Sequence, residues 1–258
     1  MKKIIFLFAI SAILFSCNEK KKSFAQNADV LADNLNGNVQ QTISTDYKVD
    51  STGKIGEQDS CCIVVTKYDE KGYITEYDNN DKATPNKKSE TFTHDGSGLM
   101  KNIKTTTDGN LSSSISVQSD NGKYTIAREL DSANKLKFYY TDISQNDYGQ
   151  LTGMKKFNAD STLSGTMSST FNKQILTGNE MKDSVGKVVY ASTVKLDDKN
   201  NPIETTEKNV TKDSTTNTVI RYKYDSFDNQ GNWTQRTEID VNGKPKKITK
   251  REITYYKK

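Results

Sequence analysis

A turn signal that recurs between alternating segments constrains the fold of this chain more than any other feature. Each copy has an apolar or aromatic residue, then Asp or Asn, then two or three polar residues and often Gly, as in residues 68–73 and 228–233. Asp and Asn begin turns by hydrogen-bonding their own backbone, and Gly supplies the positive φ that hairpin turns require. Copies begin at positions 120 and 131, 183 and 197, and 228 and 240, so 11 to 14 residues separate neighbours. That spacing fits one strand plus one turn.

The segments between these turns alternate with a period of two. Apolar or aromatic residues recur at every second position in residues 188–196, 220–224 and 124–130. This pattern is typical of antiparallel strands with one face on a core and one in water. We therefore predict an all-β protein: a single curled antiparallel meander of repeated hairpins over residues 35–258, with roughly ten or more strands. A short helix is predicted over residues 28–35, capped by Asn27 and stopped at Gly37.

The first residues read as an export signal. Lys2 and Lys3 precede an almost unbroken apolar run over residues 4–15, and Ser16 precedes Cys17. The run is too short to span a bilayer comfortably and fits a secretory signal peptide. Residues 14–17 resemble the lipobox of bacterial lipoproteins, which implies cleavage after residue 16 and acyl chains such as palmitate on Cys17. Residues 17–34 would then be a lipidated N-terminus, a tether and the short helix.

This resemblance also implies a location. A lipid-anchored chain belongs to the cell envelope, and its first partner is the membrane, reached through the lipid on Cys17. In many Gram-negative lipoproteins an aspartate after the cysteine marks retention at the inner membrane. Asn18 stands there in this chain, which favours the outer membrane. Whether the protein faces the periplasm or the outside stays open.

A second resemblance concerns the repeats. Residues 222–225 (YKYD) followed by 228–236 (DNQGNWTQR) resemble the YD repeat of RHS-type bacterial surface proteins, and residues 68–72 give a shorter match. Residues 35–47 resemble the opening of small lipoproteins that carry such repeats. The resemblance implies a β-hairpin fold and no particular activity.

Catalytic and metal-binding patterns are weak. His94 is the only histidine, and we expect it to be a solvated turn residue rather than part of a catalytic set. Cys61 and Cys62 are predicted to be ordinary strand residues, with a redox or metal pair and a link to another molecule as alternatives. The acidic turns 78–81 and 197–201 lack EF-hand spacing and are read as structural turns. We therefore predict a protein that is not an enzyme and has no metal or cofactor.

The exposed aromatics suggest where a ligand would bind. Trp233, Tyr222 and Tyr224 are candidate ligand-contact residues, although in a chain poor in Leu and Val most aromatics are expected to form the core. A net charge of +4 gives little reason to propose a nucleic-acid partner.

The leading functional hypothesis is a non-enzymatic, lipid-anchored envelope protein that acts as an interaction or structural module, with an envelope protein or a glycan as partner. Two alternatives stay open: a carbohydrate-binding or carbohydrate-processing surface lipoprotein, and a carrier of an apolar ligand in a half-barrel. A filled core favours the module, and an exposed aromatic row beside two carboxylates favours sugar chemistry. A roomy apolar cavity favours the carrier.

Overall fold

The protein is an antiparallel β-barrel with one short helix. The computed structural model describes residues 25, 28–50, 52–80, 87–211 and 213–257. In chain order the elements are α1 (Asp29–Ala32), β1 (Val39–Val49), β2 (Ile55–Tyr68), β3 (Ile74–Asn80), β4 (Lys88–His94), β5 (Met100–Thr107), β6 (Asn110–Asp120), β7 (Lys123–Asp131), β8 (Leu136–Gln145), β9 (Leu151–Asn158), β10 (Leu163–Asn172), β11 (Ile175–Asp183), β12 (Val188–Leu196), β13 (Pro202–Val210), β14 (Thr215–Phe227), β15 (Trp233–Ile239) and β16 (Pro245–Tyr255).

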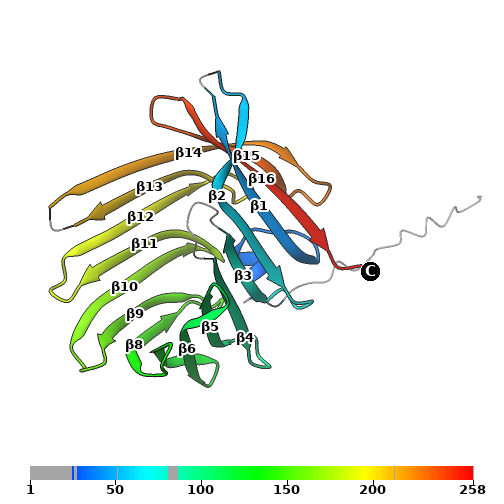
Figure 1. The fold of residues 1–258 in the computed structure, drawn as a ribbon. Helices are drawn as coiled ribbons and strands as arrows, with labels where there is room; N and C mark the ends of the chain where they lie inside the picture. Colours follow the sequence, from blue (N-terminus) through cyan, green and yellow to red (C-terminus); the bar gives the residue numbers. More distant parts are fainter. Residues whose placement is uncertain (1–24, 26–27, 51, 81–86, 212, 258) are drawn as a thin grey trace, which may run out of the picture.

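Every strand pairs with its neighbours in sequence, and β1 also pairs with β16 (Figure 1). The predicted all-β fold and antiparallel meander are confirmed. The expectation of an open, curled sheet or a half-barrel was wrong, because the first strand pairs with the last one. Val39 of β1 is opposite Tyr255 of β16, and this pairing closes the sheet into a barrel. Closure pairs the backbone groups that two edge strands would otherwise leave open. The terminal strands therefore offer no free edge to a partner.

The turns form by the predicted chemistry. The Asp69 carboxylate accepts hydrogen bonds from the backbone N–H groups of Lys71 (2.8 Å) and Tyr73 (3.0 Å). Gly72 follows with φ of +86°, a value that glycine adopts without strain. The same carboxylate or amide bonding recurs at Asp50, Asp95, Asp131, Asn146, Asp183, Asp197, Asp228 and Asp240.

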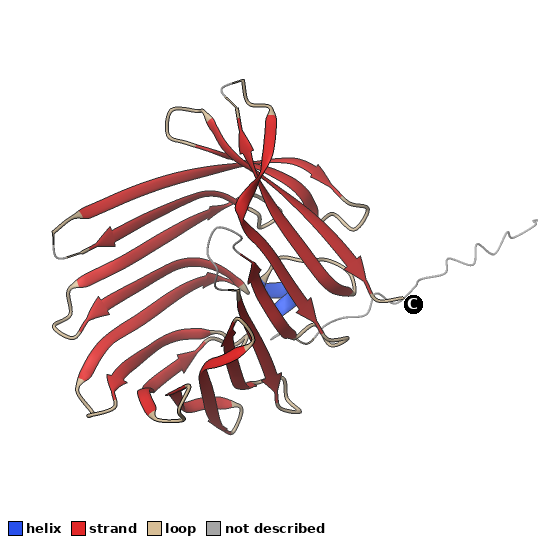
Figure 2. Ribbon diagram, viewed as in Figure 1, coloured by secondary structure: helices blue, strands red, loops and turns tan. Residues whose placement is uncertain are grey.

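Residues 28–38, which we call the N-terminal plug, cross one end of the barrel. Strands alternate in direction, so the turns after β2, β4, β12 and β14 all lie at this end. The plug contacts these turns, and Figure 2 shows its helix enclosed by the strands. Helix α1 is only four residues long, and its N-cap is Ala28, without a side-chain cap. The helix was thus predicted too long, and the predicted cap, Asn27, lies outside the described residues.

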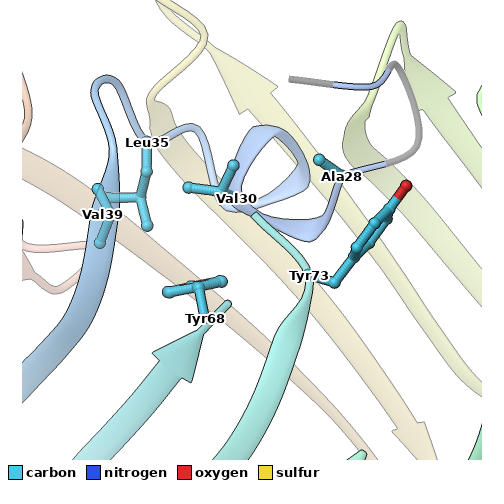
Figure 3. Close-up of a cluster of buried hydrophobic side chains, with 6 residues drawn as sticks. All are labelled: Ala28, Val30, Leu35, Val39, Tyr68 and Tyr73. Carbon is cyan, nitrogen blue, oxygen red and sulfur yellow. The ribbon is translucent and has the colours of Figure 1, made fainter. Parts of the chain in front are cut away.

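A buried apolar cluster holds the plug in place (Figure 3). Val30 of the plug and Val39 at the start of β1 have no exposed surface. Ala28 and Leu35 pack in the same cluster, against rings at the β2–β3 turn. A helix of four residues would not persist alone in water, so this packing explains why it forms.

The barrel interior away from the plug is not filled. Among the tyrosines of the described residues, only Tyr68 and Tyr73 are buried. The expectation that most aromatics form the core was therefore wrong. The physical reason is the width of the barrel: about eight strands enclose a space that side chains can fill, and sixteen enclose much more.

Candidate ligand-binding sites in the barrel interior

The strand register identifies the side chains that face the lumen. Ile103 of β5 is opposite Ile115 of β6, and Val117 of β6 is opposite Ala127 of β7. These four side chains border one cavity, so they point inward. Because side chains alternate between faces, residues 102, 104, 114, 116, 126 and 128 on the same strands point outward. The inner surface of this wall is therefore apolar where it borders the cavity.

The cavity has a volume of about 510 Å³. It lies against β5–β10, and α1 of the plug borders it through Asp29 and Ala32. The wall side chains are Leu99, Met100, Ile103, Ile115, Val117, Ala127, Tyr124, Tyr140, Ile143, Tyr148, Leu151, Met154, Met167 and Phe171. Its size and its predominantly apolar lining are typical of small-molecule sites. Three of the lining residues are methionines, whose flexible side chains adapt to ligands of different shape.

Several of the polar groups at the cavity are already paired. The Tyr140 hydroxyl donates to Glu129 Oε2 (2.7 Å), and the Tyr124 hydroxyl accepts the Met100 backbone N–H (2.8 Å). Burial, together with the Glu129 carboxylate, raises the pKa of Tyr140. The phenol therefore stays neutral at physiological pH. Because both hydroxyls are already paired, the tyrosine rings contribute mainly apolar surface to the cavity wall.

His94 is placed differently from the prediction. Its side chain is 10% exposed, stacks on Tyr73 with ring centroids 5.0 Å apart, and borders the cavity. Its Nε2 lies 3.5 Å from Asp29 Oδ2, which also accepts the Ile74 N–H at 2.7 Å. The solvated-turn expectation was wrong because the plug covers this end of β4. His94 therefore helps to fix α1 over the cavity.

Asparagine side chains tie the other half of the plug to the barrel. Asn34 Nδ2 donates to Asn201 Oδ1 (3.0 Å) in the β12–β13 turn. Asn232, in the β14–β15 turn, accepts the Asn36 N–H (2.7 Å) and donates to the Asn36 carbonyl (2.8 Å). The plug is thus anchored on both sides of the barrel end.

The opposite wall carries an arginine–aromatic cluster, formed by Tyr222, Tyr224, Trp233, Arg236 and Arg251. The three aromatics are the predicted ligand-contact residues, and the structure brings them together on β14 and β15. The rings of Tyr224 and Trp233 lie 6.0 Å apart. Arg236 Cζ is 4.8 Å from the ring centroids of both Tyr222 and Trp233. The sequence pattern did not indicate the two arginines, because in a strand they look like ordinary solvent-facing residues.

Arg251 is the most enclosed cation of this cluster. It is 9% exposed, its Cζ lies 3.7 Å from the Trp233 ring centroid, and its Nε donates to the Trp233 carbonyl (3.0 Å). Burial and the nearby charge of Arg236 lower the pKa of Arg251 to about 10. The carboxylate of Asp33 in the plug acts in the opposite direction and favours the charged form of Arg251. The strand register, followed from Met167 in the cavity across β11–β15, places Arg236 and Arg251 on the lumenal face.

A second polar group of the lumen lies next to this cluster. Lys247 Nζ contacts Asp46 Oδ2 (2.9 Å) and Glu238 Oε1 (3.1 Å). The Thr249 hydroxyl donates to Asp46 Oδ1 (2.6 Å). This wall of the lumen is thus hydrophilic, whereas the lining of the cavity at β5–β10 is mostly apolar.

The outer surface of the barrel carries ion pairs. From Met167 in the cavity the register runs through Met181 and Tyr190 to Asn209, which places Glu204 on the outer face. Glu204 contacts Lys195 Nζ (2.7 Å) and Arg221 Nε (3.0 Å) from the neighbouring strands. Five of the six outward-facing positions identified above on β5–β7 are also polar or charged, namely Asn102, Lys104, Ser114, Ser116 and Arg128. This surface is therefore suited to water.

The remaining predicted residues are placed as follows. Cys17 and the signal segment lie outside the described residues. Cys61 and Cys62 lie in β2, in agreement with the strand prediction. Within the described part of the chain, no group of three or more His, Cys, Asp or Glu side chains is placed to hold a metal ion. No helix among the described residues is long and apolar enough to cross a membrane.

Comparison with known proteins bears on the fold alone. No protein-family model matches the chain, and no curated protein matches it. A porin-like protein from Bacteroides uniformis is similar in structure, with a TM-score of 0.52 and 14% identity over 85% of this chain and 99% of its own. A porin-like protein from Bacteroides vulgatus gives a TM-score of 0.42, with 11% identity over 84% of this chain and 99% of its own. A chain of the TcdB2–TccC3 complex gives 0.29, with 12% identity over 80% of this chain and 11% of its own.

The first similarity supports the barrel architecture. At this identity it says nothing about activity, and the two lower scores are too weak to support a shared fold.

Proposed function

We propose that this protein is a non-enzymatic envelope protein that binds a small apolar ligand inside its barrel. The observation that supports this most is the cavity of about 510 Å³ with an apolar lining. Of the three functional hypotheses, the carrier is the one for which a roomy apolar cavity was the distinguishing feature. A barrel with an apolar interior pocket and a hydrophilic outer surface shelters an apolar molecule from water.

The anchor remains part of the proposal. Acyl chains on Cys17 would hold the barrel at the envelope membrane, where apolar molecules are abundant. Abolished palmitate labelling in a Cys17→Ala variant would support the anchor, and unchanged labelling would refute it.

The binding proposal is tested with a neutral fluorescent probe, N-phenyl-1-naphthylamine, titrated into the full mature chain. An Ala127→Phe variant adds a ring inside the cavity, next to Tyr140 on β8. We expect it to weaken probe binding by at least about tenfold, which corresponds to ~1.4 kcal/mol. The matched control is Ile126→Phe, because residue 126 is on the outer face of the same strand.

Two results would overturn the proposal. One is failure of the folded protein to bind the probe with saturation. The other is equal affinity in the Ala127→Phe, Ile126→Phe and unmodified proteins, with circular dichroism showing that all three keep their β-structure. If Ala127→Phe does not fold, Ala127→Leu provides the same comparison with a smaller side chain.

A further inference from the structure

Two arginines in the lumen have hydrogen-bonding groups without partners. Arg251 is more than nine-tenths buried, yet its Nη2 has no hydrogen-bond partner among the described residues. The same holds for Nε of the half-buried Arg236. Buried polar groups in native proteins are nearly always paired, and leaving a charged one unpaired is costly. These two groups therefore point to a ligand that supplies acceptors.

The nearby carboxylates are engaged elsewhere. Asp46 and Glu238 both contact Lys247, and Asp33 of the plug accepts the Tyr68 hydroxyl. In the described part of the chain, neither Arg236 nor Arg251 has a carboxylate oxygen within ion-pair distance. The arginine–aromatic cluster is thus a positively charged spot in the lumen whose guanidinium groups make no direct ion pair with a described carboxylate, and Asp33 acts on Arg251 only from a longer distance.

The geometry of the cluster suits an oxyanion. Trp233 packs against both guanidinium groups, with Cζ distances of 3.7 Å for Arg251 and 4.8 Å for Arg236. Stacking on an aromatic ring fixes the plane of a guanidinium and leaves its edge free to donate. A planar fork of donors matches the oxygens of a carboxylate or phosphate group.

We propose that Arg236 and Arg251, held by Trp233, form a binding site for an oxyanion, either a carboxylate or a phosphate group. The site uses β15 and β16, whereas the apolar cavity uses β5–β10 and α1. It is therefore a second site, which goes beyond the proposed function and takes a different class of ligand.

Trp233 reports directly on this site, because it is the only tryptophan of the chain. The full mature protein is titrated with inorganic phosphate and, separately, with acetate, at constant ionic strength, and tryptophan fluorescence is followed. We expect a saturable change with at least one of these anions, and the pair of titrations shows whether phosphate or carboxylate is preferred. Isothermal calorimetry gives the affinity without reliance on the fluorophore.

The variants separate specific binding from general charge. Arg236→Gln should weaken binding at least about tenfold, since a charge-assisted pair is lost. Arg221→Gln removes a positive charge on the adjacent strand, but Arg221 is on the outer face and pairs with Glu204, so the affinity should stay unchanged. Arg236→Lys keeps the charge without the fork and should bind with intermediate affinity. If Arg236→Gln does not fold, Arg236→Lys is compared with Arg221→Gln instead.

The proposal fails if neither anion gives a saturable signal by fluorescence or calorimetry. It also fails if Arg236→Gln and Arg221→Gln bind equally well. Binding of the apolar probe should survive in Arg236→Gln, and anion binding should survive in Ala127→Phe. Failure of this inference and failure of the proposed function are thus distinguishable.

Discussion

The asparagine at position 232 provides the sharpest test of how the plug is held. Asn232 is 1% exposed, and its side chain makes three short hydrogen bonds besides a longer one, of 3.5 Å, from Asn36 Nδ2. It accepts the Asn36 N–H (2.7 Å), and it donates to the Asn36 carbonyl and to the Tyr255 hydroxyl (both 2.8 Å). An Asn232→Ala variant removes these hydrogen bonds, and water reaches the site too poorly to replace them.

The size of the effect follows from those bonds. A buried hydrogen-bonding group that loses its partner costs about 1–3 kcal/mol. Tyr255 keeps its bond to Asp228, so the two Asn36 backbone groups dominate the loss. We therefore expect Asn232→Ala to lower the free energy of unfolding by about 3 kcal/mol.

Urea unfolding followed by far-UV circular dichroism measures this change. The matched control is Asn229→Ala, an exposed asparagine of the same turn, which should change stability by less than about 0.5 kcal/mol. A separate early transition in Asn232→Ala would mean that the plug detaches before the barrel unfolds. If the two variants lose the same small amount of stability, the argument that Asn232 fastens the plug is wrong.

Substitutions at Gly98, Lys247 and Tyr255 test the turn geometry, the lumenal ion pairs and the tyrosine hydroxyl beside Asn232. Gly98 has a φ of +85°, and in Gly98→Ala the added methyl group would overlap a tyrosine hydroxyl. This variant should lower the free energy of unfolding by more than about 3 kcal/mol. Gly122 also has a positive φ but open space around it, so Gly122→Ala should cost about 1 kcal/mol in the same urea assay. Lys247→Met leaves two lumenal carboxylates without their shared cation and should lower the free energy of unfolding by about 3 kcal/mol. Lys195→Met on the outer surface should lower it by less than about 0.5 kcal/mol. Equal losses of stability in the two variants would contradict the assignment of Lys247 to the lumen and Lys195 to the outer surface. Burial and a hydrogen bond to a turn carboxylate raise the pKa of Tyr255 from 10.0 to about 12. The stabilisation that this tyrosine provides is therefore present below pH 10 and is lost as the pH rises through 12. Between pH 10 and pH 12, the free energy of unfolding should fall less steeply in Tyr255→Phe than in the unmodified protein.

Local interactions along the chain are enough to specify the turns and strands of this protein. Asp or Asn followed by Gly specifies the turns, because the side-chain oxygen at Asp69 or Asp228 bonds the next backbone N–H groups without help from the rest of the chain. Alternation specified strands at residues 188–196 and 220–224, and both exist. The three predicted ligand-contact aromatics also proved to be neighbours, because β14 and β15 form one hairpin.

Barrel closure, the position of the plug and the two candidate sites depend on contacts between segments that are far apart in the chain. Closure depends on pairs such as Val39 with Tyr255, which are far apart in sequence and leave no local signature. Alternation also does not tell which face of a strand points into the barrel when both faces carry polar residues. Arg236 and Arg221 look alike in the sequence, yet Arg236 faces the lumen and Arg221 pairs with Glu204 on the outer surface. A cavity is the space left between side chains of several strands, so its existence is set by barrel width and by the plug rather than by any one segment.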